Sequence, residues 1–151
     1  MIRKAKVTDI RAIHRMLDFY SRRNEMLGRS LSELYDNLRD FYVYTDGEPE
    51  QVVGACAMHI CWEDLAEVRS LCVLEEHQGR GIGTKLVDAC ISEAITLSLF
   101  KIFVLTYRPG FFQKLGFREV DKSTLPHKVW ADCIHCVKFP ECDEIAMVLN
   151  L

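Results

Sequence analysis

Apolar and polar residues show two different periodicities at the start of the chain, first that of a strand and then that of a helix. Residues 2–7 alternate weakly between them, which predicts a short strand. Thr8 is then placed as the N-cap of a helix with one apolar stripe, formed by Ile10, Ile13, Leu17 and Tyr20. A capping box of Ser30 and Glu33 predicts a second, short helix that starts after Ser30.

The next stretch predicts strands. Residues 41–45 are aromatic and β-branched, residues 51–60 form a second run of this type, and Asp46-Gly47 between them is a turn signal. After a turn at residues 62–64, residues 66–74 supply a third strand. Together these runs predict an antiparallel meander.

Helices and strands alternate in the second half of the chain. Glycines within residues 78–83 precede a long helix whose buried face is expected at Ile82, Leu86, Cys90, Ala94 and Ile95. A strand at 101–106, a short helix between Pro109 and Gly116, an extended piece at 117–120 and a last strand at 144–149 follow, with a loop inserted at about 121–143. This order predicts an α/β (α+β) fold with a central, mixed but largely antiparallel sheet flanked by helices.

The length of the chain and its net charge indicate how many domains it forms and which partners it does not bind. With 151 residues, 49% of them apolar, we expect one domain over residues 1–151. A net charge of −3 provides no basic field for nucleic acid, and we see neither a secretory signal nor a membrane span. We therefore expect a cytoplasmic protein that binds neither nucleic acid nor membrane and keeps its seven cysteines mainly as thiols.

The glycine loop is the first candidate for a ligand site. Alternating glycines before a helix let the backbone approach a ligand, and the N–H groups of the first helical turn suit a phosphate. Gly79-x-Gly81-x-Gly83 matches neither the dinucleotide fingerprint nor the phosphate-binding loop of nucleotide hydrolases. A nucleotide-like ligand is indicated, and a glycine-rich connector without a ligand stays open.

Two motifs carry a resemblance to a known family. Gln78-x-x-Gly81-x-Gly83 directly follows the strand that ends Leu71-Cys72-Val73, and residues 112–117 read Phe-Gln-Lys-Leu-Gly-Phe. Both resemble the GNAT superfamily of acetyl-CoA-dependent N-acetyltransferases, whose order of elements is also similar to the one predicted here over nearly the whole chain. The resemblance implies the GNAT acyl-CoA N-acyltransferase fold and acetyl-CoA as cosubstrate.

The resemblance also implies which residues hold the coenzyme. The strand before the loop would meet the pantetheine arm, and the loop with the start of the helix would meet the pyrophosphate. The residues so implied are Leu71, Cys72, Val73, Gln78, Gly79, Arg80, Gly81, Ile82, Gly83, Thr84 and Phe112.

Three further segments resemble a narrower group, the short stand-alone N-acetylglutamate synthases. They are residues 29–34, 64–71 and 105–112. This implies transfer of an acetyl group to the α-amino group of L-glutamate, a small-molecule partner, in the first step of arginine biosynthesis. Another small amine or a protein N-terminus as acceptor, or a non-catalytic acyl-CoA-binding sensor, stays open, as does a homodimer.

Acyl transfer to an amine needs a base, an oxyanion donor and an acid. By resemblance, Glu67 is the base and the backbone N–H of Val73 the oxyanion donor. A solvent-facing Glu67 without a role is the alternative, and His59 on the neighbouring strand is the second candidate base. Many GNAT members carry a Tyr where this chain has Phe111-Phe112, so the acid would be Tyr107 or water, with Tyr107 as packing the alternative.

A dicarboxylate acceptor would need cationic partners, and Arg binds carboxylates bidentately. Arg29 and Ser30 match the substrate-binding segment of N-acetylglutamate synthases by resemblance, and Arg69 and Arg108 lie near predicted strand ends. For each arginine an ordinary surface charge is the alternative.

A cysteine cluster in the inserted loop suggests a metal. Cys133, Cys136 and Cys142, with His127 as fourth ligand, have a C-x2-C spacing suited to structural zinc. His135 or Asp143 are other fourth ligands. Reduced thiols packed in the loop, or an oxidised pair, are the alternatives.

Overall fold

The computed structural model describes residues 1–126 and 144–151. Its strands are β1 (Ile2–Lys4), β2 (Phe41–Asp46), β3 (Gln51–Trp62), β4 (Leu65–Val73), β5 (Lys101–Thr106), β6 (Arg118–Val120) and β7 (Ile145–Asn150). Its α-helices are α1 (Ile10–Arg22), α2 (Leu31–Asp36), α3 (Ile82–Thr96) and α4 (Pro109–Lys114). Short turns of 3-10 helix cover Val7–Asp9, Leu38–Asp40, Glu75–His77 and Lys122–Thr124.

The described strands form one seven-stranded sheet in the order β1-β2-β3-β4-β5-β7-β6. Every neighbouring pair is antiparallel except β4 and β5, which run parallel. The predicted mixed, largely antiparallel sheet with flanking helices is therefore confirmed.

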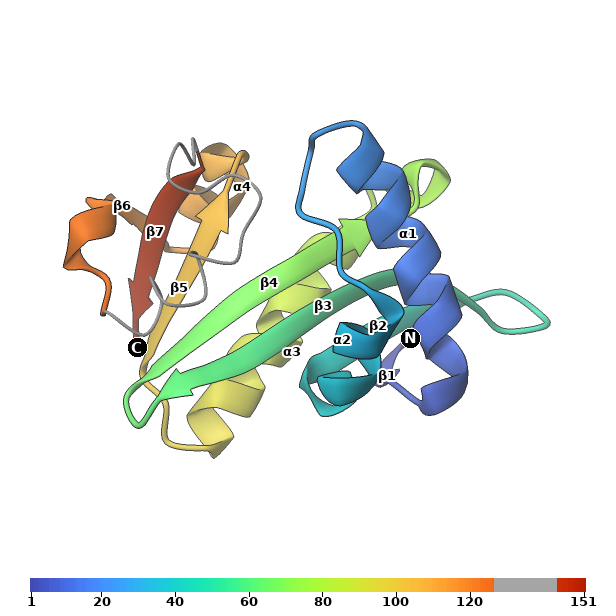
Figure 1. Cartoon of the computed structure of the whole chain (residues 1–151), viewed down its shortest axis with the longest axis horizontal. Coiled ribbons are helices and arrows are strands. Elements are labelled where there is room, and N and C mark those ends of the chain that lie inside the picture. Colours follow the sequence, from blue (N-terminus) through green and yellow to red (C-terminus); the bar gives the residue numbers. More distant parts are fainter. Residues whose placement is uncertain (127–143) are drawn as a thin grey trace.

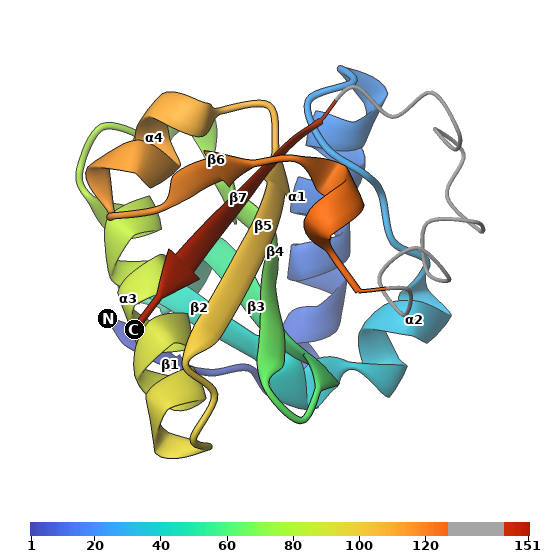
Figure 2. The same ribbon diagram turned by 90° about the vertical axis from the view of Figure 1, so that its left-hand side faces the viewer.

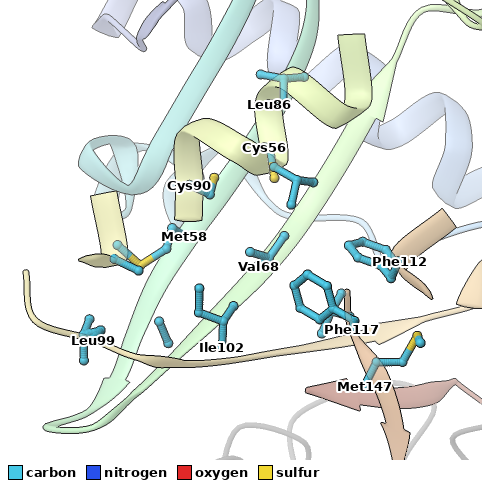
Figure 3. Close-up of a cluster of buried hydrophobic side chains, with 14 of the residues drawn as sticks. Cys56, Met58, Val68, Leu86, Cys90, Leu99, Ile102, Phe112, Phe117 and Met147 are labelled. Atoms are coloured by element: carbon cyan, nitrogen blue, oxygen red, sulfur yellow. The ribbon is translucent and has the colours of Figure 1, made fainter. Parts of the chain in front are cut away.

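Helices cover both faces of this sheet (Figure 2). On one face, the apolar side of α3 packs on β3, β4 and β5; Figure 3 shows Leu86 and Cys90 of α3 above Cys56 and Val68 of the sheet. On the other face, α1 and α2 pack on β2 and β3 through a second cluster that includes Ile13, Leu17 and Leu34. Within the described residues, no helix is both long and apolar enough to cross a membrane.

A bulge interrupts β4 in its second half. Ala57 of β3 pairs with Arg69 and Ala55 pairs with Cys72, so two residues of β4 lie opposite one of β3. The first of the two, Ser70, has a φ of +57°, in the left-handed region that residues other than glycine rarely adopt. The bulge keeps both Arg69 and Cys72 on the face covered by α1.

β4 and β5 separate soon after they meet. Their ladder pairs Ala66 with Ile102 and Glu67 with Phe103, and beyond these residues the strands diverge (Figure 1). The sheet thus carries a gap between its fourth and fifth strands.

Helix α1 begins at Ile10, one residue later than an N-cap at Thr8 predicts. Val7–Asp9 form a turn of 3-10 helix, and Asp9 precedes the first α-helical residue. The Asp9 carboxylate accepts hydrogen bonds from the Arg3 guanidinium at 2.7 and 3.1 Å and from the Lys6 N–H at 2.7 Å. Burial raises the pKa of Asp9, but these bonds outweigh it and hold the pKa below its usual value.

We expect Asp9→Asn to lower the free energy of unfolding at pH 7 by about 1.5–3 kcal/mol, because charge-assisted hydrogen bonds are lost. Since folding lowers the pKa of Asp9, its contribution is present above the unfolded-state pKa and lost as pH falls through the folded-state pKa. Urea unfolding should therefore show a smaller difference between the two proteins at pH 3 than at pH 7.

Asp18→Asn is the matched control for this comparison. Asp18 pairs with Arg22 on the exposed side of α1, and such surface pairs contribute about 0–1 kcal/mol. An Asp9→Asn effect no larger than that of the control would contradict the prediction.

Candidate active site

A cavity of about 570 Å³ opens where β4 and β5 separate. Its walls come from the end of α1 and the link after it, from β4, from the glycine loop with the first turn of α3, from the end of β5 with α4, and from Glu144. This volume is typical of small-molecule sites. The gap in the sheet therefore forms a cavity of the size of a small-molecule site.

The glycine loop forms part of this cavity. Gly79 and Gly81 each have a φ of +77°, and Gly81 directly precedes α3. A side chain at either position would be strained, so glycine is required for this turn. The N–H groups of Ile82, Gly83 and Thr84 in the first turn have no partner inside the helix, as at any helix start, and suit an anion.

Phe111 of α4 lies close to Gly83 in the first turn of α3. A Cβ atom at Gly83 would lie 3.4 Å from Cζ of Phe111. Phe112 is buried and contacts Phe111 and Phe117 edge to face, with ring centroids 5.0 and 5.3 Å apart. Phe111 and Phe112 line the cavity, so the wall formed by α4 is apolar.

The end of β4 turns backbone groups toward the cavity. The N–H of Leu74 donates to the carbonyl of Val53 on β3 at 2.9 Å. Because backbone groups alternate in direction along an antiparallel strand, the N–H and C=O of Val73 point away from β3. The Val73 carbonyl accepts hydrogen bonds from the Tyr20 hydroxyl and, at 3.2 Å, from the Gln78 amide.

Two side chains next to Val73 stay protonated at neutral pH. Burial raises the pKa of Tyr20, although its hydrogen bond from Gln78 lowers it, so the hydroxyl remains a donor. Burial also raises the pKa of Cys72 to about 12, so this residue is a thiol and not a thiolate.

Charged side chains occupy the first half of β4 and the link after α1. Arg69 Nη1 lies 3.6 Å from Glu67 Oε1, and each of these side chains is 15% exposed. Arg29 lines the cavity as well, with Nη1 3.4 Å from Glu33 Oε2. A largely buried carboxylate and two guanidinium groups thus share one cavity.

A second cluster of charged side chains lies between the link after α1 and the end of β5. Arg108 Nη2 is 3.9 Å from Glu25 Oε2, and Arg23 bridges Glu25 and Glu75 at 3.3 Å each. The Arg108 side chain is 69% exposed, so its ion pair is solvent-screened.

Comparison with known proteins places this geometry in a family. The family model for the acetyltransferase (GNAT) domain matches residues 37–119, which contain β4, the glycine loop and α3. The chain belongs to the GNAT acetyltransferase family. The predicted fold and acetyltransferase activity are thereby confirmed.

GNAT relatives match most of the chain. An uncharacterized N-acetyltransferase from Chlorobaculum tepidum is 40% identical over 150 residues, 99% of this chain and 96% of the relative. An amino-acid acetyltransferase from Mycobacterium tuberculosis is 33% identical over 131 residues, 86% of this chain and 75% of the relative.

Solved GNAT structures have the same fold. A crystal structure from Mycobacterium tuberculosis, in complex with CoA and NLQ, has a TM-score of 0.88 at 28% identity and covers 100% of this chain and 99% of that one. N-acetylglutamate synthase from Neisseria gonorrhoeae, solved with coenzyme A and N-acetyl-glutamate, has a TM-score of 0.89 at 22% identity. This chain covers 35% of that longer protein, and at such identity the match shows the fold alone.

The GNAT structure gathers most of the predicted site residues. Those that line the cavity are Arg29, Glu67, Arg69, Leu71, Cys72, Val73, Gln78, Gly79, Gly81, Ile82, Gly83, Thr84, Tyr107, Arg108 and Phe112. Arg80 is exposed and does not line it. Ser30 does not line it either, because its hydroxyl caps α2 by accepting the Glu33 N–H at 3.1 Å.

His59, the second candidate base, lies beside the cavity and does not line it. It is directly opposite Glu67 in the β3–β4 ladder. Its Nδ1 lies 2.7 Å from Asp40 Oδ2, which fixes the ring toward β2 and α2. Glu67 is therefore the better placed of the two.

Several residues that line the cavity were not predicted as site residues, among them Tyr20, Glu25 and Glu144. Tyr20 was visible only as part of the apolar stripe of α1, although a buried tyrosine hydroxyl needs a polar partner. Glu144 is 8% exposed, and a charged residue just before a strand gave no signal of burial.

The proposed zinc ligands His127, Cys133, Cys136 and Cys142 lie outside the described residues. Among residues 1–126 and 144–151, no three His, Cys, Asp or Glu side chains are grouped as a metal site would require. The zinc hypothesis therefore stays a prediction from the sequence.

Proposed function

We propose that this protein, acting as one domain in the cytoplasm, transfers the acetyl group of acetyl-CoA to the α-amino group of L-glutamate, the first step of arginine biosynthesis. The observation that carries the proposal is the grouping of Glu67, Arg69 and Arg29 in the cavity beside the glycine loop. Glutamate offers an amine to a base and two carboxylates to guanidinium groups. The similarity to the amino-acid acetyltransferase of Mycobacterium tuberculosis supports an amino acid as acceptor.

In this proposal β4 supplies the residues nearest the reacting atoms. Glu67 takes a proton from the ammonium group of the acceptor, directly or through water, and the free amine attacks the thioester carbon. The N–H of Val73, which points away from β3, donates to the oxyanion. The C–S bond then breaks, the departing thiolate takes a proton from Tyr107 or from water, and the second proton lost by the amine nitrogen restores that donor.

The arginines divide between two tasks. Arg29 from the link after α1 and Arg69 from β4 bind the acceptor carboxylates, and Arg69 also orients Glu67 through their ion pair. Arg108 is more exposed and is paired with Glu25, so we assign it a smaller contribution to acceptor binding.

Turnover of acetyl-CoA with a panel of acceptors tests the function. The purified protein is incubated with glutamate, glutamine, aspartate, lysine and simple amines, and the N-acetyl product is measured by mass spectrometry. Selective formation of N-acetylglutamate supports the proposal. Turnover with another amine and not with glutamate contradicts the acceptor assignment, and tight CoA binding without any turnover favours a sensor.

We expect direct transfer of the acetyl group without an acetyl-cysteine intermediate. Cys72 lines the cavity, but burial holds its thiol protonated with a pKa of about 12, and the thiol is a poor nucleophile. Incubation with radiolabelled acetyl-CoA in the absence of acceptor should leave Cys72 unlabelled, and Cys72→Ala should retain kcat within about threefold. Stoichiometric label on Cys72 would contradict this expectation.

A further inference from the structure

Two side chains from distant parts of the chain converge on the carbonyl of Val73. The Tyr20 hydroxyl, 53 residues away in sequence, donates to this oxygen, and Gln78 Nε2 donates to it at 3.2 Å. Gln78 Nε2 also donates to the Tyr20 hydroxyl at 2.8 Å. These three groups, which we call the Val73 clamp, form a closed triangle of hydrogen bonds.

The Val73 carbonyl accepts two hydrogen bonds within the Val73 clamp. A side-chain amide has two N–H bonds, a tyrosine hydroxyl has one donor and accepts readily, and a carbonyl oxygen has two lone pairs. Gln78 Nε2 donates to both the Tyr20 hydroxyl and the Val73 carbonyl, and the hydroxyl in turn donates to the carbonyl. Both lone pairs of the Val73 carbonyl thus have a donor from within the protein.

The clamp fixes the end of β4 on both sides. The peptide between Val73 and Leu74 donates its N–H to Val53 at 2.9 Å and accepts the clamp through its carbonyl. Tyr20 is buried at 6% exposure, and Phe19 contacts its ring edge to face with centroids 5.0 Å apart. A buried residue of α1 thereby links the strand end to the first residue of the glycine loop.

We propose that Tyr20 and Gln78 are positioning residues for acetyl-CoA, which act together by orienting the end of β4 and the glycine loop. In this role the Gln78 side chain bonds to the protein and not to the coenzyme, unlike the direct contact that the motif suggested. The inference rests on the proposed function, because it assumes that the cavity between β4 and the glycine loop binds CoA.

Calorimetric titration with CoA tests the clamp in Tyr20→Phe, Gln78→Ala and the double variant. Loss of a neutral hydrogen bond typically costs about 0.5–1.5 kcal/mol, so each single change should weaken CoA binding by roughly 2- to 12-fold. The double variant should bind CoA no more than about twofold more weakly than the weaker single variant, because the two side chains act as one unit. The KM for the acceptor should change by less than about twofold in all three variants.

Tyr42→Phe is the matched control. Tyr42 is a partly buried tyrosine whose hydroxyl donates to Glu93 Oε2 on α3 at 3.0 Å, and it does not line the cavity. Its loss should leave CoA affinity unchanged. Gln78 lies in an exposed loop, so Gln78→Ala keeps the test available if Tyr20→Phe fails to fold.

The outcomes separate the clamp from the function. A Gln78→Ala variant that loses CoA affinity beside an unaffected Tyr20→Phe shows direct contact between Gln78 and the coenzyme and overturns the inference. If the loss of CoA affinity in the double variant equals the product of the two single losses, the inference is overturned as well. An unmodified protein that does not bind CoA overturns the proposed function and the clamp's role together, whereas CoA binding unaffected in every variant overturns the clamp alone.

Discussion

Replacing Glu67 by glutamine is expected to lower kcat by about 10²- to 10⁴-fold, the usual contribution of a positioned general base. Glu67 is largely buried on the cavity wall, with Arg69 3.6 Å away. The glutamine side chain has nearly the same shape but does not accept the proton of the acceptor ammonium. Steady-state kinetics with saturating acetyl-CoA and glutamate give kcat, and titration with CoA shows whether coenzyme binding stays within about twofold.

Glu63→Gln serves as the control for this change. Glu63 is exposed in the turn between β3 and β4, only four positions before Glu67, so the same chemical replacement there should leave kcat unchanged. Retention of kcat within about threefold in Glu67→Gln would contradict the base assignment. His59, directly opposite Glu67 in the ladder, would then be the next residue to replace.

Replacing Arg29 by alanine is expected to raise the KM for glutamate by roughly 10- to 150-fold. Hydrogen bonds to charged groups contribute about 1.5–3 kcal/mol, and each 1.4 kcal/mol corresponds to a factor of ten. The KM for acetyl-CoA should stay within about twofold, because the glycine loop and β4 are untouched. Arg29→Lys should recover part of the loss, since it restores the charge without the bidentate geometry.

Arg22→Ala is the control for Arg29. Arg22 is 79% exposed on α1 and pairs with Asp18 at 3.0 Å, away from the cavity. Melting temperatures of both variants show whether loss of the contact between Arg29 and Glu33 disturbs α2. Equal KM values for glutamate in Arg29→Ala and Arg22→Ala would remove Arg29 from the acceptor site.

The sequence predicted the elements whose signals are local. The strand at 101–106 and the α2 capping box of Ser30 and Glu33 are found as expected, because period-two runs and caps depend on neighbouring residues. The glycine loop was found for the same reason, since Gly79 and Gly81 need a conformation that few other residues adopt.

Features that depend on distant residues were not predictable. The bulge at Ser70 lies inside a run that looks like an ordinary strand, and only its register against Ala55 and Ala57 reveals it. The bond from Tyr20 to Val73 joins residues 53 positions apart, and periodicity shows that Tyr20 is buried without showing its partner. The late start of α1 follows from the Arg3 and Lys6 bonds to Asp9, which compete with a cap at Thr8.

In the part of the chain that the structure describes, β4 and β5 pair only at Ala66–Ile102 and Glu67–Phe103. Beyond these residues, each of the two strands has an edge inside the molecule that is not paired with the other. On a protein surface, such open edges pair with other chains and promote aggregation. Here they face a cavity of about 570 Å³, where a thin, extended molecule with amide groups reaches them more readily than another polypeptide does. A molecule bound there in place of a strand would complete the interrupted sheet, so the backbone hydrogens of β4 should exchange with solvent more slowly in the loaded protein than in the free one.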